Sequence, residues 1–236
     1  MSFTLSAKNY FLLLTTFMLI FSSCKKSSSS DPSPSAPSTE WFSIRQSTAD
    51  TARTMNGYLY LTTSYLTGTT PGNPLGTEVI TVKKIKGDFE LLAKYSSFHT
   101  TGTNSTSSTF GMILSSDNPN PSNGVLSGIL EIDAMYAEDS SFATNTLTKA
   151  TTSREGEWYV KRTGGDYVSW FRAGSDTLFM NKTNYITSDL SFEVSIGAFD
   201  NTATNCSVHI DDFQLTGGGT DVSSDPFDKS NDVTAY

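Results

Sequence analysis

The chain has 236 residues and a formal net charge of -8, with 24 acidic against 16 basic side chains. This balance argues against a nucleic-acid partner, because phosphate recognition needs a stripe of Lys and Arg, and the sequence shows none. Aromatic residues make up 12% of the chain and charged residues only 17%, so a chain of this length can bury a sizeable core. Short runs rich in Val, Ile, Tyr and Phe alternate with stretches of Ser, Thr, Asn and Gly, which is typical of an all-β protein outside the cytoplasm.

Residues 1–23 have the features of a targeting segment. Lys8 precedes the apolar run Tyr10–Phe21, which is too short to span a bilayer, and two serines then lead to Cys24. This order resembles the signal of bacterial lipoproteins, in which the cysteine is lipidated and becomes the first residue of the mature chain. It predicts lipidation at Cys24 and an outer-membrane lipoprotein that faces either the periplasm or the cell surface. The alternative is an ordinary cleaved signal followed by an incidental cysteine.

The rest of the chain divides into three parts. Residues 24–39 are rich in Ser and Pro and predict a flexible tether, and residues 40–216 predict one folded domain. Residues 217–236 are polar and acidic without a period, which predicts a disordered tail. The only other cysteine is Cys206. If Cys24 is acylated, no intramolecular disulfide can form, and packing must stabilise the domain.

The folded domain is predicted to consist of β-strands. Alternating apolar and polar residues recur in short segments between turns rich in Gly, Pro and Asn, and no convincing amphipathic helix occurs between residues 40 and 216. The pattern predicts an all-β fold, a two-sheet antiparallel β-sandwich of the jelly-roll type. Around a central hairpin, the expected strands are Trp41–Gln46, Asn56–Leu66, Val79–Ile85, Asp88–Phe98, Thr109–Ser116, Gly124–Tyr136, Leu190–Asp200 and Cys206–Leu215.

The central hairpin, Glu157–Ala173, is the best-marked element. Its strands are joined by Gly164-Gly165, a pair that accepts the positive φ required at both central positions of a type I′ turn. A turn of two residues also fixes the register of the strands. The resulting cross-strand neighbours include Trp158 with Phe171, Tyr159 with Trp170, and Arg162 with Tyr167.

Four segments carry a resemblance to a known superfamily. They are Gly87–Leu91 (GDFEL), Phe110–Leu114 (FGMIL), Glu157–Arg162 (EWYVKR) and Val208–Leu215 (VHIDDFQL). In this order they resemble the concanavalin A-like lectin/glucanase superfamily, in particular a lipoprotein-borne branch of it, over roughly residues 40–216. The resemblance implies two curved antiparallel sheets and a concave face that often binds glycans.

Glu131-Ile132-Asp133 is the sharpest enzymatic candidate, because laminarinase-like hydrolases of this superfamily use a strand with an E-x-D pattern and a further Glu. A retaining glycosidase needs two carboxyl groups about 5 to 5.5 Å apart. If Gly124–Tyr136 is one strand that continues in extended form, the next carboxylate, Glu138, lies about 23 Å from Glu131. The sequence therefore predicts solvated carboxylates on a strand face and no enzymatic activity. Neither histidine, His99 or His209, belongs to a nucleophile or zinc motif.

Asp211 and Asp212 are the candidate metal ligands. Even-numbered positions are apolar up to Ile210 and odd-numbered positions are apolar from Phe213 onward, so the period shifts at the two aspartates. A β-bulge would absorb this shift and re-aim one carboxylate. Calcium takes carboxylate and carbonyl oxygens, so structural calcium is a candidate, although no cofactor is required. The alternative is that Asp212 only bonds neighbouring backbone amides.

The hairpin faces define the candidate ligand site. Trp158, Val160 and Phe171 are expected in the core, which leaves the opposite face half exposed. A flat aromatic ring there can contact the CH face of a pyranose while polar groups bond its hydroxyls. The alternative is that this opposite face packs against the second sheet. The candidate carbohydrate-binding residues are Tyr159, Lys161 and Trp170, with Glu131 and Asp133 nearby.

These features predict a lipid-anchored cell-envelope protein whose β-sandwich binds a polysaccharide or glycan without catalysis. Its partners are expected to be the glycan and, through the lipid at Cys24, the membrane. A structural or protein-interaction module of the envelope is the first alternative, and it would use a sheet edge or a loop. The second alternative is a glycoside hydrolase with an unrecognised site.

Overall fold

The computed structural model describes part of the unit Pro37–Tyr236, namely residues 41–45, 50–64, 75–81, 85–101, 108–116, 124–139, 145–185, 187–198, 205–217, 227 and 233–235. The predicted signal, Cys24 and the tether lie outside these residues. Within the described ranges no helix is long and apolar enough to cross a membrane.

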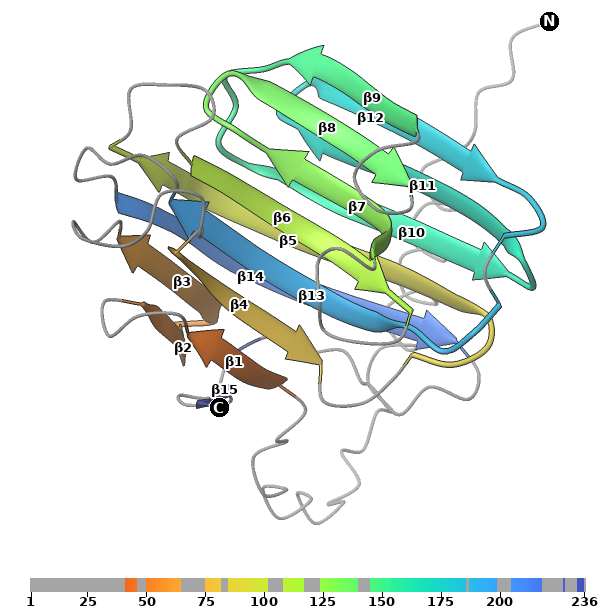
Figure 1. Cartoon of the computed structure of the whole chain (residues 1–236), viewed down its shortest axis with the longest axis horizontal. Coiled ribbons are helices and arrows are strands. Elements are labelled where there is room, and N and C mark those ends of the chain that lie inside the picture. The colour runs from red at the N-terminus through yellow and green to blue at the C-terminus, as the bar shows by residue number, and fades with distance from the viewer. Residues whose placement is uncertain are drawn as a thin grey trace, which may run out of the picture. The chain divides into compact units, whose positions relative to one another are not determined.

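Every regular element of the described residues is a β-strand (Figure 1). In chain order the strands are β1 (Trp41–Arg45), β2 (Thr51–Met55), β3 (Tyr58–Ser64), β4 (Leu75–Thr81), β5 (Phe89–Thr100), β6 (Ser108–Ser115), β7 (Gly124–Leu130), β8 (Ala134–Asp139), β9 (Asn145–Ala150), β10 (Gly156–Thr163), β11 (Asp166–Ala173), β12 (Asp176–Lys182), β13 (Ser191–Ala198), β14 (Asn205–Gly217) and β15 (Val233–Ala235).

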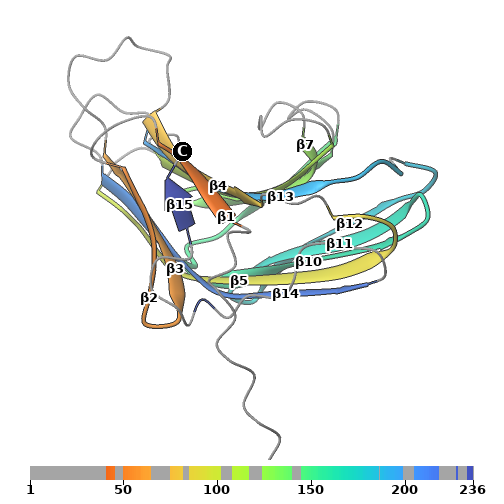
Figure 2. The same ribbon diagram turned by 90° about the horizontal axis from the view of Figure 1, so that it is seen from below.

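The strands form two sheets that pack face to face (Figure 2). The eight-stranded sheet has the order β15-β1-β4-β13-β6-β7-β8-β9, and the seven-stranded sheet has the order β12-β11-β10-β5-β14-β3-β2. All neighbouring strands described are antiparallel except β1 and β15, which are parallel. The outer face of the eight-stranded sheet is concave, as the edge-on view shows (Figure 2). The predicted two-sheet antiparallel sandwich is therefore confirmed.

The core lies between the inner faces of the two sheets. Strand β13 contributes the four alternate residues that its pattern predicts, and all of them are buried: Phe192, Val194, Ile196 and Ala198. Cys206 on β14 is also buried and is a free thiol. Aromatic rings from both sheets meet in this layer, for example Trp158 with Phe192 at 6.2 Å between ring centroids.

The central hairpin has the predicted register, with Trp158 opposite Phe171 and Tyr159 opposite Trp170. Its turn differs from the prediction. Gly164 has a φ of +58°, whereas Gly165 is not among the residues of positive φ. This pattern fits a type II′ turn, in which only the first central residue needs positive φ. Both turn types match the twist of the strands, so the register is the same.

The predicted strand Gly124–Tyr136 is wrong, because the chain reverses within it. Strands β7 and β8 are joined by a tight turn at Glu131–Asp133, in which the Glu131 amide donates to the Ala134 carbonyl at 2.9 Å. Alternation on either side of a three-residue turn is continuous in the sequence, so periodicity alone does not detect the break. Glu131 and Asp133 therefore lie in a turn and not on a strand face.

The predicted disorder of residues 217–236 is wrong for the residues of this segment that the structure describes. Phe227 is buried in the core, with 0% of its surface exposed. Strand β15 pairs in parallel with β1, with Trp41 opposite Val233. A single aromatic ring and three backbone-paired residues leave no periodic signal in a polar segment.

Gly156 offers a test of how closely β10 packs against its two neighbours, β11 and β5. A Cβ atom at this position would overlap the carbonyl oxygen of Arg172 and lie 2.7 Å from the hydroxyl of Tyr95. We expect Gly156→Ala to lower the free energy of unfolding by about 1–3 kcal/mol, because backbone atoms must move to admit the methyl group. Urea denaturation followed by circular dichroism measures this loss.

The matched control is Gly165→Ala in the hairpin turn. Its new Cβ would meet no heavy atom closer than 3.4 Å, which is an ordinary contact, and its backbone is not left-handed. We expect a change within about 0.5 kcal/mol. Equal losses of stability in the two variants would contradict the tight packing described at Gly156.

Candidate functional site

The structure separates the five candidate carbohydrate-binding residues into two groups. Tyr159, Lys161 and Trp170 share the outer face of the seven-stranded sheet. Glu131 and Asp133 belong to the β7–β8 turn of the eight-stranded sheet. The two groups therefore do not form one site.

The hairpin faces are assigned by burial. Trp158, Val160 and Phe171 are 1%, 0% and 0% exposed, and they pack in the core as predicted. Tyr159 and Trp170 are half-buried on the opposite face. That face is the outer side of the sandwich, so the alternative in which it packs under the second sheet does not hold.

An aromatic row crosses this outer face. The register places Phe179 of β12, Trp170 of β11 and Tyr159 of β10 side by side, followed by Leu92 of β5. The rings of Tyr159 and Trp170 stack with centroids 5.4 Å apart and planes 14° apart. Phe179 is 65% exposed. The row formed by Phe179, Trp170 and Tyr159 is thus an apolar surface open to solvent, and Phe179 was not identified from the sequence.

A charged row runs beside the aromatic row on the same face. It consists of Arg172, Glu157, Lys94 and Asp212, which are direct neighbours on β11, β10, β5 and β14. Arg172 and Glu157 form an ion pair at 2.6 Å, and Lys94 and Asp212 form one at 3.5 Å. The guanidinium of Arg172 also lies over the ring of Trp170, 4.7 Å from its centroid. Arg172 thereby joins the two rows.

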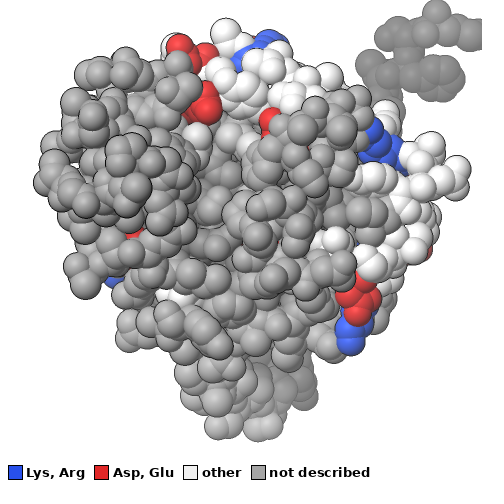
Figure 3. Space-filling view, in the orientation of Figure 1, with Lys and Arg blue, Asp and Glu red and all other residues white. Residues whose placement is uncertain are grey.

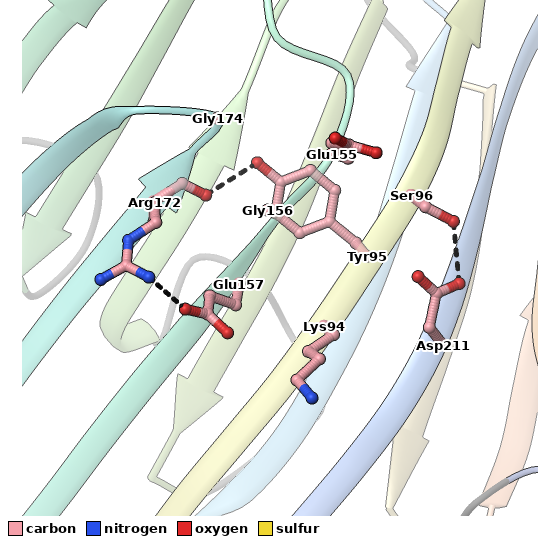
Figure 4. Close-up of a pocket in the computed structure, with 9 residues that line it drawn as sticks. All are labelled: Lys94, Tyr95, Ser96, Glu155, Gly156, Glu157, Arg172, Gly174 and Asp211. Carbon is pink, nitrogen blue, oxygen red and sulfur yellow. Dashed lines mark hydrogen bonds and ion pairs between the residues drawn. The ribbon is translucent and has the colours of Figure 1, made fainter.

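A shallow pocket of about 280 Å³ opens alongside the charged row (Figure 4). The hydroxyl of Tyr95 donates to the carbonyl oxygen of Arg172 at 3.1 Å, and Ser96 donates to Asp211 at 2.8 Å. Tyr95 is only 1% exposed and lines the pocket from the core side, beside Gly156, which has no side chain. The lining residues are Lys94, Tyr95, Ser96, Glu155, Gly156, Glu157, Arg172, Gly174 and Asp211.

The pocket owes part of its shape to an irregularity in β14. The register between β14 and β5 shifts between Ile210 and Asp212, which confirms the predicted β-bulge. Asp211 and Asp212 are both half exposed, whereas Ile210 and Phe213 on either side are buried. The bulge therefore turns two consecutive carboxylates toward solvent, and Asp211 reaches the pocket.

The two aspartates have different electrostatic surroundings. Burial raises the pKa of Asp211, and the nearby carboxylates of Glu155 and Asp212 act in the same direction, while the Ser96 hydroxyl and His209 oppose the rise. Asp212 instead accepts from the amide of Gln214 at 2.6 Å and pairs with Lys94.

Calcium binding at Asp211 and Asp212 stays a prediction. Among the residues that the structure describes, no group of three or more His, Cys, Asp or Glu side chains is arranged to hold a metal ion. Of the two histidines, His99 is exposed, and His209 stacks on Tyr58 at 5.1 Å between centroids.

The β7–β8 turn brings three carboxylates closer together than an extended chain would allow. The turn folds β8 back along β7, so that Glu138 lies opposite Ser127 of β7. The separation of about 23 Å between Glu131 and Glu138, which was expected for one extended strand, therefore does not apply. Burial raises the pKa of Glu131, a hydrogen bond from Tyr136 at 3.0 Å opposes this, and the charges of Asp133 and Glu138 add to the rise.

Two buried carboxylates on the concave face were not identified from the sequence. Glu193 and Glu138 are 0% and 9% exposed, and both point to the outer side of the eight-stranded sheet, away from the core. They belong to one register row through Ile113 and Ser127, and Ser115 donates a hydrogen bond to Glu193. In a space-filling view from this side, the visible charged side chains of described residues lie toward the margins (Figure 3). A single Glu between apolar residues is predicted to be exposed from the alternation of the strand. The sequence therefore does not indicate that Glu193 and Glu138 are buried.

Glu138 makes the stability of the protein depend on pH. Thr146 donates to one of its carboxylate oxygens at 3.2 Å, and the other has no hydrogen-bond partner among the described residues. Burial raises the pKa of Glu138 above its ordinary value, so the folded protein binds this proton more tightly than the unfolded chain does. The resulting stabilisation is present below the ordinary pKa and is lost as pH rises through the folded pKa.

We expect Glu138→Gln to remove this pH dependence and to raise the free energy of unfolding at neutral pH by about 1 kcal/mol, because an uncharged amide replaces a buried charge. Thermal melts between acidic and neutral pH measure the effect. Glu90→Gln, at an exposed carboxylate of β5, is the control and should leave the pH profile unchanged. An unchanged profile in Glu138→Gln would contradict the assignment.

No known protein family and no curated protein matches the chain. Solved structures do match it. The chain is similar to the carbohydrate recognition domain of Emp46p, with a TM-score of 0.50 and 14% identity over 75% of this chain and 88% of that one. It is similar to an alginate lyase A1-II′, with a TM-score of 0.50 and 11% identity over 76% of this chain and 95% of that one.

A sialidase also matches, with a TM-score of 0.52 and 6% identity, over 76% of this chain but only 17% of the sialidase chain. At these identities the likeness shows the fold and no more. The fold expected from the four sequence segments is confirmed. The protein is a two-sheet antiparallel jelly roll with the concanavalin A-like fold.

Proposed function

We propose that the protein binds a glycan without catalysis, and that the site is the pocket together with the aromatic row. The observation that carries the proposal is that the pocket and the aromatic row lie next to each other. A hollow lined by carboxylates, a guanidinium and a hydroxyl lies on one face of the sandwich beside an aromatic row whose outermost ring, Phe179, is exposed. Sugars present both kinds of surface, since their CH faces are apolar and their hydroxyl groups donate and accept hydrogen bonds.

The two parts of the site have different tasks. The exposed ring of Phe179, with the half-buried Trp170 beside it, packs against the CH face of a pyranose ring. Glu157, Arg172 and Asp211 bond hydroxyl groups of the neighbouring sugar in the pocket. At about 280 Å³, the pocket is near the lower end of the range of about 300–1,000 Å³ for small-molecule sites. It accommodates a short part of a glycan, while the aromatic row supports its continuation.

Binding without catalysis is supported by the contacts of two of the three pocket carboxylates. Glu157 is held by Arg172 at 2.6 Å, and Asp211 accepts a hydrogen bond from Ser96 at 2.8 Å. A general acid or base must be free to exchange a proton with the substrate, whereas these groups are oriented by their neighbours. The fold itself is compatible with both roles, because the similar structures include a carbohydrate recognition domain and an alginate lyase.

Protein interaction is the second candidate function, and one observation favours it. Phe179 is 65% exposed on β12, which is an edge strand of the seven-stranded sheet. An exposed aromatic side chain on a sheet edge can receive an added strand from a partner. This candidate needs Phe179 but not the pocket, so variants of the pocket residues distinguish the two functions.

The test of glycan binding is the substitution Trp170→Ala, measured by a glycan array and then by calorimetry with the best ligand. We expect about a tenfold loss of affinity, because truncation removes the central ring of the aromatic row. The control is Val168→Ala, which shortens an exposed side chain on the same strand and face but outside the row and the pocket. An array without any bound glycan, or equal affinity in Trp170→Ala and wild type, would refute the proposal.

The predicted lipid anchor at Cys24 remains a part of the proposed function, and with it the location in the outer membrane. Metabolic labelling with a fatty-acid analogue in a Gram-negative host tests it. We expect label and membrane association in the wild type and the loss of both in Cys24→Ser, because the serine cannot form the thioether link to the lipid. Cys206→Ser is the control, since its buried thiol takes no part. Label that persists in Cys24→Ser would show that the anchor lies elsewhere.

A further inference from the structure

The pocket is lined by more negatively charged than positively charged side chains. Three carboxylates, Glu155, Glu157 and Asp211, face two cations, Lys94 and Arg172. Both cations already have anionic partners: Arg172 pairs with Glu157, and Lys94 pairs with Asp212 just outside the lining. The cations of the pocket are therefore neutralised before any ligand arrives.

Glu155 and Asp211 are the carboxylates left over. Neither forms an ion pair within the described residues; Asp211 accepts a hydrogen bond from Ser96, and the nearby His209 acts on it electrostatically. In the close-up, Glu155 lies beyond the ring of Tyr95, and Asp211 lies beside Ser96 on the other side of β5 (Figure 4). Two carboxylates without an ion-pair partner, the half-buried Asp211 and the exposed Glu155, give this part of the pocket a negative potential that water screens only in part.

We propose that the glycan bound here carries a free amine, as in glucosamine units, and that the pocket excludes polyuronates. The inference rests on the proposed glycan-binding function and specifies the sugar class for the same site. An ammonium group donates three hydrogen bonds, which Asp211 and Glu155 can accept, and charge-assisted hydrogen bonds of this kind are the strong ones. A uronate chain would bring further carboxylates against them. The net charge of -8 for the whole chain acts in the same direction.

The aromatic row distinguishes an amino sugar from other amines. Tyr159, Trp170 and Phe179 offer flat apolar area next to the charged pocket, and a pyranose with an equatorial amine presents an apolar CH face together with the ammonium group. A lysine side chain has the charge without the flat ring. Recognition of an amino sugar uses both halves of the site, whereas recognition of a basic peptide uses only the carboxylates.

Three β-1,4-linked hexamers that differ mainly at carbon 2 provide the test: glucosamine, N-acetylglucosamine and glucose. A hexamer of mannuronate and a hexamer of lysine complete the set for titration calorimetry at low and at physiological salt. We expect glucosamine to bind about tenfold more tightly than glucose, the difference of one charge-assisted hydrogen bond. The advantage should shrink at higher salt, and mannuronate should not bind.

Two variants assign the preference to the pocket. Asp211→Asn and Glu155→Gln should each reduce the advantage of glucosamine over glucose severalfold while leaving the affinity for the glucose hexamer nearly unchanged. Glu90→Gln removes the same charge from the same face outside the pocket and should keep the full advantage. Circular dichroism confirms that each variant is folded.

The outcomes separate this inference from the proposed function. Equal binding of glucosamine and glucose, preferred binding of mannuronate, or lysine hexamer binding as tightly as glucosamine would overturn the amino-sugar specificity while glycan binding stands. The same holds if Glu90→Gln loses the advantage as fully as Asp211→Asn does. If no glycan on the array or in this set binds, the proposed function itself fails.

Discussion

The pairing of β10 with both of its neighbours is the constraint on which the rest of the site depends. On one side Tyr159 lies opposite Trp170, and on the other it lies opposite Leu92. A shift of one residue in either register would move every side chain of the strand to the other face. The same alternation buries Trp158 and Val160. Core and candidate site are therefore the two faces of one strand, and a change in the register of β10 would disrupt both.

The bulge in β14 interrupts the regular pairing of the sheet at one position. A regular strand would place only one of two consecutive residues on the outer face. At the bulge, both Asp211 and Asp212 lie outside, and they serve different parts of the surface: Asp212 neutralises Lys94, while Asp211 reaches the pocket. One of the two surplus carboxylates of the pocket, Asp211, is thus a consequence of one extra residue in one strand.

The central strands were predictable from the sequence, whereas the edges were not. The registers of the hairpin, the inward face of β13 and the bulge in β14 follow from alternation and turn chemistry. The four strands that the sequence did not reveal, β2, β9, β12 and β15, are the four edges of the described sheets. An edge strand has one hydrogen-bonded neighbour and needs little apolar alternation. The pocket was missed for another reason, since it unites β5, β10, β11 and β14, whose pairing depends on contacts distant in sequence.

The buried thiol of Cys206 has a consequence for the compartment in which the protein can work. Burial raises the pKa of this thiol to about 12, so at neutral pH it is protonated and shielded, and only the thiolate attacks disulfides or oxidants. The chain can therefore remain in an oxidising environment without cross-linking to a second copy through this residue. Its chemical inertness comes from packing of the core and requires no reducing system.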